Sequence, residues 1–257
     1  MTGASGLLGR HLVAALRERG AELVDVADAD VVFHLAAQTT VPAAREDPVG
    51  TFEANVALAW RVLSAAPRAV FASSDQVYGP RPPVVPIPET APLDPDGPYA
   101  ASKAAADLIA RSLDGVVVAR LVNLYGPGDR HETRLVPGTI AALRAGRAPV
   151  VRGTGEEARD LLYVEDAAAA LLALADAGEA GEAYNVGTGA VTRVRDVVQT
   201  LIDVSGVDVE PEILGLTPPG EGGARSVDTT RIRAATGWAP ATTLDEGLRR
   251  TWHAPPS

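Results

Sequence analysis

The 257-residue sequence contains no cysteine. This absence excludes disulfide bonds, thiolate metal sites and a cysteine nucleophile, and it fits a reducing compartment such as the cytoplasm. Histidine is scarce as well, because the four histidines lie far apart and form no metal-ligand spacing. We therefore expect a protein without a bound metal.

Positive charge is in deficit: 23 Lys and Arg residues face 33 Asp and Glu residues, which gives a net charge of -10. This charge repels a nucleic-acid backbone, and no basic cluster offsets it, so we expect no nucleic-acid partner. The longest apolar run lies between Asp166 and Asp176 and is too short to span a bilayer. With no visible signal peptide, we expect no membrane attachment and a cytoplasmic location.

Strand and helix patterns alternate along the first half of the chain. The β-branched runs have the length and continuity of parallel strands that are buried on both faces. The alternation predicts an α/β fold with a doubly wound, Rossmann-like parallel sheet, shortened at its N-terminal side. Strands are expected at 21–26 and from Val31, Ala69 and Val116, with helices at 6–19, 48–66 and 99–113.

The pattern loosens from Tyr125 onward, which predicts a smaller second lobe. We expect a dinucleotide-binding lobe at 1–124 and a substrate-binding lobe at 125–257, with a strand near 184–188 returning to the first lobe. The segment from Pro80 to Pro98 holds eight prolines and should run over the surface, where it could cover a ligand. Helices of the second lobe are expected at 133–145, 164–175 and 193–204.

Three residues could share one proton. Tyr99 and Lys103 stand four residues apart on a predicted helix and so share a face, while Ser74 ends a predicted strand. A free phenol titrates near about 10 and needs a pKa about three units lower to act as a base near neutrality. An adjacent cation and a positively charged nicotinamide could supply that shift, which indicates alcohol oxidation or carbonyl reduction. The spacing is also common on ordinary helices.

A glycine-rich turn opens the first helix. Gly3, Gly6 and Gly9 would let the backbone approach a pyrophosphate at the positive end of that helix. The strand predicted next ends at Asp25, whose carboxylate could accept hydrogen bonds from a ribose diol. Asp28 and Asp30 compete for that role, and a glycine spacing alone is weak evidence.

The adenine side of this nucleotide site is expected to be shortened. Only Met1 and Thr2 precede the glycine turn, and Asp25 is followed almost at once by the next strand. A crossover helix of a dozen or more residues has no room there. One hypothesis is that the native start lies upstream, with Met1 standing where a valine would end the first strand.

Nine segments match one family in the right order: GASGLLG, HLAAQ, DPVGTFEANV, SSDQVYG, YAASK, ARLVNLYGPGD, RDLLYVEDAA, YNVGTG and TGWAPATTLDEGLRRT. On these motifs the sequence resembles the extended short-chain dehydrogenase/reductase family, in its nucleotide-sugar epimerase/dehydratase branch. Within that branch, HLAAQTTV, SSDQVYG and RLVPGTI are most similar to the CDP-glucose 4,6-dehydratase group.

The resemblance implies a role for each matching residue. Tyr99 would take a proton from a sugar hydroxyl, Lys103 would lower its pKa and bind the nicotinamide ribose, and Ser74 would hold the substrate oxygen. Hydride would pass from sugar C4 to NAD, with NADP as the other possible cofactor. The catalytic set is Ser74, Asp75, Tyr99 and Lys103; the cofactor set is Gly3, Gly6, Gly9, Asp25, Ala36 and Lys103; the substrate set is Ser74, Gln76, Asn123 and Arg159.

Several of these positions also have ordinary structural interpretations. Asn123 could cap a strand end, and Arg159 could pair with Asp160 or Glu157. His34 and Asn55 match positions on the cofactor side, but a hydrogen-bonded interior polar group is an equal explanation for Asn55 and the favoured one for His34.

Asp75 and Gln76 bear on which reaction follows oxidation. By resemblance, an acid at Asp75 protonates the leaving hydroxyl in dehydratases. Gln76 cannot act as a base, because an amide neither gains nor loses a proton near neutrality. The resemblance thus implies an NAD-dependent nucleotide-sugar epimerase or dehydratase that forms a homodimer through the helices at 48–66 and 99–113. The alternatives are an NADPH-dependent 4-keto-sugar reductase and a catalytically silent nucleotide-binding scaffold.

Overall fold

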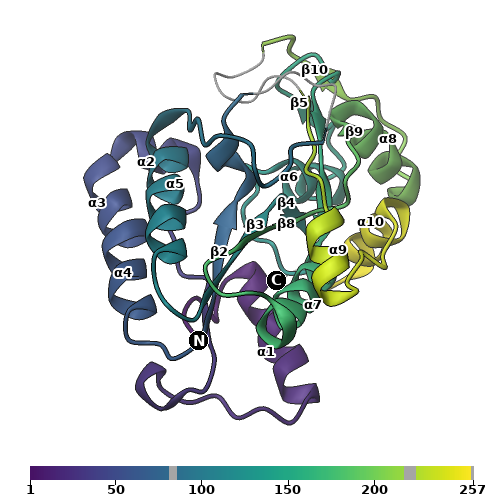
Figure 1. The fold of residues 1–257 in the computed structure, drawn as a ribbon. Coiled ribbons are helices and arrows are strands. Elements are labelled where there is room, and N and C mark those ends of the chain that lie inside the picture. Colours follow the sequence, from purple (N-terminus) through teal and green to yellow (C-terminus); the bar gives the residue numbers. More distant parts are fainter. Residues whose placement is uncertain (81–85, 217–223, 256–257) are drawn as a thin grey trace.

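The computed structural model describes residues 1–80, 86–216 and 224–255, and its central element is a four-stranded parallel sheet (Figure 1). The strand order is β1-β2-β3-β8. The strands of this sheet are β1 (Val32–His34), β2 (Ala69–Ser74), β3 (Val116–Leu121) and β8 (Ala183–Val186). The predicted doubly wound α/β fold is confirmed, since each of these strand pairs is parallel.

Helices cover both faces of the sheet (Figure 1). On one face, α1 and α7 pack over Val70 and Ala72 of β2, and on the other face α4 and α5 pack over Ala69 and Phe71. This alternation follows from the period of two in a strand. The helices are α1 (Leu7–Glu18), α2 (Val41–Glu46), α3 (Pro48–Phe52), the π-helical turn η2 (Glu53–Ala57), α4 (Leu58–Leu63), α5 (Gly97–Arg111) and α7 (Val164–Ala177).

A second hydrophobic cluster lies beside the main sheet, built from α6, α8 and α10 and the strands next to them. Its small sheets have the orders β4-β7, β10-β5 and β11-β6-β9. The remaining elements are η1 (Val26–Asp28), η3 (Asp75–Tyr78), β4 (Asn123–Tyr125), α6 (Leu135–Arg144), β5 (Val150–Val151), β6 (Ala158–Arg159), β7 (Leu161–Tyr163), β9 (Thr192–Arg193), α8 (Val194–Ser205), β10 (Glu212–Ile213), β11 (Ala224–Arg225), α9 (Thr230–Thr236) and α10 (Leu244–His253).

The strand predicted at 21–26 is wrong. Residues 21–25 are extended without strand pairing and lead into the short 3₁₀ helix η1. Leu23 and Val24 are 43% and 39% exposed, so their apolar pattern does not reflect burial. A strand needs a neighbour for its backbone groups, and the free edge of β1 is occupied by Thr2, whose amide donates to the Phe33 carbonyl at 3.0 Å.

The expectation that the proline-rich segment runs over the surface is wrong at Ile87, which is buried. Its amide donates to Ser226 and its carbonyl accepts from Asp228, both at 2.9 Å. This backbone pairing draws the segment into the main core. The part of the segment at 81–85 lies outside the described residues. Within the described ranges, no helix has the length and apolar character needed to span a membrane.

A buried ion pair fastens α5 to the sheet. Asp107 on α5 accepts hydrogen bonds from Arg120 of β3, at 2.8 and 3.0 Å, and from the Ser73 hydroxyl of β2 at 2.7 Å. Both charged side chains are almost completely buried. Arg120 also donates to the Tyr78 hydroxyl at 2.9 Å. The pair therefore fixes the helix relative to the strand that ends at Ser74.

Replacing Arg120 by Met should strongly destabilise the protein, because it leaves the Asp107 carboxylate buried without its cation. The expected loss in unfolding free energy is about 3 to 5 kcal/mol, measured by urea denaturation. The matched control is Arg249→Met, which removes an exposed pair with Asp245 and should leave the urea midpoint unchanged. Equal midpoints for the two variants would contradict the role of the buried pair.

Candidate active site

The structure brings Ser74 and Tyr99 together at the carboxyl end of β2. Ser74 ends the strand and caps η3, where its hydroxyl accepts from the Gln76 amide at 3.2 Å. The Tyr99 phenol lies within hydrogen-bonding reach of the Ser74 side chain. In parallel sheets this end is where ligands bind. Two of the three predicted proton-handling groups are therefore adjacent.

The Tyr99 phenol is protonated near neutral pH in this structure. Burial raises its pKa, and the charge of Asp75 raises it further. The Ser74 hydrogen bond and the positive charge of Arg134 act in the opposite direction. A base near neutrality needs a lowered pKa, so Tyr99 requires a closer cation than Arg134 in order to accept a proton.

Lys103 is buried one helical turn beyond Tyr99 on α5, and its ammonium contacts the end of β2. It donates to the Ala72 carbonyl of β2 at 2.6 Å and lies 4.6 Å from the centre of the Phe71 ring. A buried ammonium needs an acceptor, and the end of β2 provides one. Burial lowers the pKa of Lys103 to about 8, while the charge of Asp107 partly offsets this shift.

Asp75 follows Ser74 directly, and its carboxylate is buried between a hydroxyl and a guanidinium. It accepts from the Ser74 hydroxyl at 3.3 Å and pairs with Arg225 at 3.6 Å. Burial raises the pKa of Asp75, although the charges of Arg225 and Arg159 and the Ser74 hydrogen bond lower it. A carboxyl group with a raised pKa can donate a proton closer to neutral pH than an ordinary one.

The substrate residues predicted from the sequence lie around this centre. Gln76 is half-buried on η3, and Asn123 is exposed at the start of β4, just beyond the β3 residue that pairs with Ser74. Arg159 lies on β6, paired in register with Arg225. The positive charge of Arg159 lowers the pKa of Asp75. All three residues thus lie on segments near the end of β2.

Asp160 and Arg134 were not predicted as members of the site. The Asp160 carboxylate accepts from the Thr188 and Gly189 amides at 2.9 and 3.0 Å. Burial raises the pKa of Asp160 to about 6, its hydrogen bonds oppose that shift, and the charge of Asp75 adds to it. Arg134 pairs with Asp129 at 3.1 Å. The adjacent Arg159 and Asp160 in the sequence could have indicated that Asp160 belongs to the site. No sequence pattern places Arg134 near Tyr99, because only the fold brings the two residues together.

The glycine-rich turn lies against Ala36, in the segment that follows β1. Gly3 has a positive φ of 74°, and a Cβ there would lie 2.7 Å from the Ala36 amide nitrogen. A Cβ at Gly9 would overlap the Gly3 carbonyl oxygen. Only glycine allows this close packing at the N-terminus of α1. Asp25, in contrast, is exposed at the N-cap of η1 rather than at a strand end.

His34 and Asn55 are both buried, and Asn55 is fully hydrogen-bonded. The Asn55 side chain exchanges bonds with the Gln38 backbone at 2.7 and 3.0 Å and donates to Ser102 at 2.9 Å. Ser102 in turn donates to the Tyr99 carbonyl at 2.8 Å. Asn55 lies in the π-helical turn η2, a distortion often found near functional sites. It therefore supports the first turn of α5.

His34 has one ring nitrogen 2.7 Å from the Thr2 hydroxyl, and the other has no hydrogen-bond partner among the described residues. Its ring stacks on Phe71 with a centroid distance of 5.8 Å. Burial lowers the pKa of His34 to about 4, and the charge of Lys103 contributes to this shift. His34 is therefore neutral near physiological pH.

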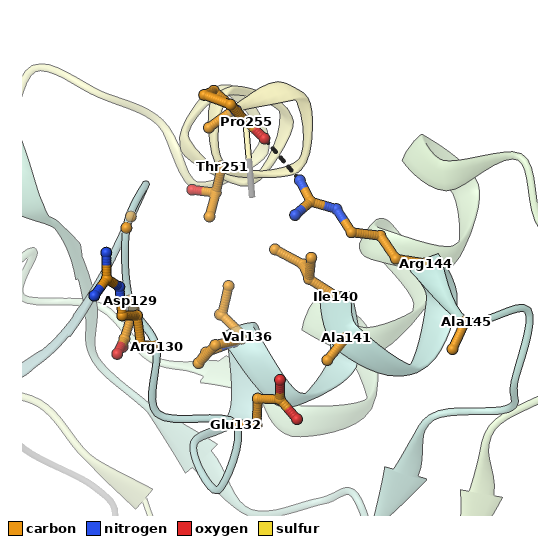
Figure 2. A pocket seen from close by; sticks show the side chains of 14 residues that line it. Asp129, Arg130, Glu132, Val136, Ile140, Ala141, Arg144, Ala145, Thr251 and Pro255 are labelled. Carbon is orange, nitrogen blue, oxygen red and sulfur yellow. Dashed lines mark hydrogen bonds between the residues drawn. The ribbon is translucent and has the colours of Figure 1, made fainter. Parts of the chain in front are cut away.

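A separate pocket of about 490 Å³ lies between the loop at 126–132, helix α6 and the end of α10 (Figure 2). Figure 2 shows Arg144 reaching across it to the end of α10, where it donates to the Ala254 carbonyl at 2.7 Å. Ser74, Tyr99 and Lys103 do not line this pocket. The reactive groups thus gather elsewhere, at the end of β2.

Comparison with protein families matches residues 21–187 to the NAD-dependent epimerase/dehydratase family. The chain is 34% identical to UDP-glucose 4-epimerase of Mycolicibacterium smegmatis over 239 residues, covering 86% of this chain and 74% of that protein. It is 32% identical to dTDP-glucose 4,6-dehydratase 1 of Escherichia coli K12 over 257 residues, covering 86% and 71%. The resemblance to CDP-glucose 4,6-dehydratases stays a prediction.

Among solved structures, the chain is similar to UDP-glucose 4-epimerase of Thermotoga maritima with UDP-glucose. The TM-score is 0.88 at 28% sequence identity, and the match covers 97% of this chain and 96% of the other. The likeness extends over both hydrophobic clusters and agrees with the family match.

Acidification should lower the free energy of unfolding through the buried His34. Because its folded pKa lies near 4 and its unfolded pKa near 6.5, the unfolded chain binds a proton that the folded chain does not. Stability is therefore lost as pH falls from 6.5 to 4, by about 3 kcal/mol from this group. His34→Gln should remove that part of the loss, measured by urea unfolding at both pH values. His131→Gln, at an exposed position, should keep the full loss, and identical pH slopes for the two variants would contradict the prediction.

Proposed function

This chain belongs to the NAD-dependent epimerase/dehydratase family, and we propose that it reversibly oxidises the C4 hydroxyl of a nucleotide sugar. Epimerisation or dehydration is the net reaction. The observation that carries the proposal is the convergence of Ser74, Tyr99 and buried Lys103 at the carboxyl end of β2. Similar relatives act on UDP-glucose or dTDP-glucose by name, which supports a nucleoside-diphosphate sugar as the substrate.

The residues present fit the nicotinamide and diphosphate half of NAD. A diphosphate suits the N-terminus of α1, where Gly3 and Gly9 keep the backbone free of side chains. Lys103 and the unpartnered ring nitrogen of His34 lie next to the Phe71 ring at the same end of the sheet. NAD, when bound, supplies a hydride acceptor for the sugar carbon. NADP is the other possible cofactor.

The chain's own residues then manage the proton of the sugar hydroxyl. Ser74 holds the hydroxyl oxygen, and Tyr99 exchanges its proton. For Tyr99 to act as the base, the positive charge of Lys103 has to stabilise the phenolate from one turn away on the same helix face. The charge of Arg134 adds to this effect.

Asp75 is the acid available for a dehydration step. Its burial favours the protonated form, and its contact with Ser74 places it beside the substrate oxygen. Gln76 cannot supply the matching base. Dehydration also requires a base that removes the proton from sugar C5, and in this site that base would be Tyr99 or a bound water. Epimerisation needs only Ser74, Tyr99 and Lys103.

Cations around Asp75 suit the diphosphate of the substrate. Arg159 and Arg225 lie side by side on paired strands, and the positive charge of each lowers the pKa of Asp75. A guanidinium offers a planar fork of donors to phosphate oxygens. Asn123, exposed at the same end of the sheet, is the neutral donor we assign to the diphosphate.

We also propose a cytoplasmic location for the protein.

Tyr99→Phe should lower turnover of UDP-glucose or dTDP-glucose by about 10²- to 10⁴-fold, because it removes the proton-exchanging group. Product formation is followed by chromatography, and cofactor reduction by absorbance. The control is Tyr184→Phe, whose hydroxyl accepts from the Glu179 amide away from the site, and it should leave turnover unchanged.

Two outcomes would contradict the proposal. Unchanged turnover or cofactor reduction in Tyr99→Phe would favour a nucleotide-binding scaffold. Turnover of a 4-keto sugar that depends on added NADPH, with no retained NAD in the purified protein, would favour a reductase instead.

We also propose that two copies of the chain associate through α3, α4 and α5, which lie along one flank of the molecule (Figure 1). Large apolar side chains are exposed on these helices: Val49 is 70% exposed, Phe52 53%, Trp60 49% and Leu108 57%. Aromatic residues in such a patch contribute strongly to association. The expected assembly is a homodimer in which α3, α4 and α5 of the two copies pack against one another.

The double variant Trp60→Glu/Leu108→Glu should convert the dimer into a monomer, because it places charge in the centre of the apolar contact. Sedimentation velocity gives the mass of each species. Ile213→Glu, at an exposed apolar position on β10, is the control and should remain dimeric. A monomeric unmodified chain, or a dimer that survives the double variant, would contradict this assembly.

A further inference from the structure

The segment that links α1 to β1 does not have the structure that a dinucleotide-binding fold uses to hold adenosine. In such folds, a second strand follows the first helix and ends at an acidic residue that binds the ribose diol. Here residues 19–31 contain the 3₁₀ helix η1 and no strand. Asp25 has a suitable distance in sequence from the glycine turn, but it lies exposed before η1.

The apolar residues of this segment are not buried as they would be in a strand of the sheet. Leu23 and Val24 are 43% and 39% exposed. An adenine ring needs apolar walls on two sides to gain affinity from burial. The described residues on this side supply an open loop.

The residues proposed to hold the nicotinamide and the diphosphate are, in contrast, closely packed and hydrogen-bonded. The Gly3 turn packs against the Ala36 backbone, and Asn55 and Ser102 support the turn that carries Tyr99. Lys103 is buried at the end of β2. The proposed cofactor site therefore combines a packed, hydrogen-bonded part with an exposed loop.

We propose that this chain recognises its nicotinamide cofactor through the nicotinamide, its ribose and the diphosphate, and that the adenosine contributes little affinity. This inference rests on the proposed function, since it concerns the same cofactor. NAD and NADP then bind with similar strength, because the 2′-phosphate that distinguishes them lies over the open loop. Nicotinamide mononucleotide lacks the adenosine and one phosphate of the diphosphate, and we expect it to bind within about tenfold of NAD.

Charge on the loop adds one measurable detail. Glu22, Asp25, Asp28 and Asp30 are all exposed, and they repel the additional 2′-phosphate of NADP. Because exposed charges are screened within about 8 Å at physiological ionic strength, this repulsion weakens with salt. NADP therefore binds slightly more weakly than NAD at low salt, and the difference disappears at higher salt.

The chain provides its own spectroscopic probe, since Lys103 is its only lysine. Protein labelled with ¹³C-lysine gives one side-chain signal, which is titrated with nicotinamide mononucleotide, NAD, NADP and AMP. We expect the first three to shift the signal with dissociation constants within about tenfold of one another. AMP should neither shift the signal nor compete with NAD.

The loop is tested with a matched pair of variants, Asp25→Asn and Asp28→Asn. Both should retain the NAD affinity of the unmodified chain within about twofold, because neither carboxylate contacts the ribose. A larger loss confined to Asp25→Asn would overturn the inference. So would a dissociation constant for NAD more than about tenfold below that for the mononucleotide, or competition by AMP.

Failure of the proposed function has a different signature. If no nicotinamide compound shifts the Lys103 signal, the chain does not place this cofactor at Lys103, and the oxidation mechanism falls together with the inference. If NAD shifts the signal and the mononucleotide binds far more weakly, the mechanism stands and only the inference on adenosine is overturned.

Discussion

The geometry of the site depends on one buried carboxylate, that of Asp107. It neutralises Arg120 and accepts the Ser73 hydroxyl, so it joins α5 to β2 and β3 at once. Its charge also opposes the effect of burial on Lys103. Since Ser74 follows Ser73, and Tyr99 and Lys103 lie on the same helix as Asp107, a shift of α5 would move the phenol and the ammonium away from the Ser74 hydroxyl. The ion pair is costly to desolvate, and its use here is to position other groups.

Around the end of β2, two carboxylates and several guanidiniums balance one another. Asp75 and Asp160 are both buried, burial raises the pKa of each, and the charge of Asp75 raises the pKa of Asp160 further. Arg225 pairs with Asp75 at 3.6 Å on one side. A diphosphate that drew Arg225 toward itself would weaken this pairing and favour protonated Asp75. In the proposed reaction, Arg225 would thus couple diphosphate binding to the protonation of Asp75.

The sequence predicted the regular elements better than the connections. The strands at Ala69 and Val116 were readable because six consecutive residues of each are buried, and Tyr99 and Lys103 were readable from helical spacing. The segment at 21–26 misled because an apolar pattern does not show whether a partner strand exists. Ile87 was misassigned because its burial comes from pairing with residues 226–228, far along the chain. The Arg225–Asp75 contact depends on the same distant packing.

The position of the single lysine carries information that spacing alone does not. The chain uses arginine at every other strongly basic position, yet retains lysine at residue 103. An arginine there could not replace it, because a guanidinium stays protonated and needs several planar acceptors. The buried ammonium is satisfied by the Ala72 carbonyl, and burial lowers its pKa to about 8. In the proposed reaction, this compact cation is the one that would stabilise the Tyr99 phenolate.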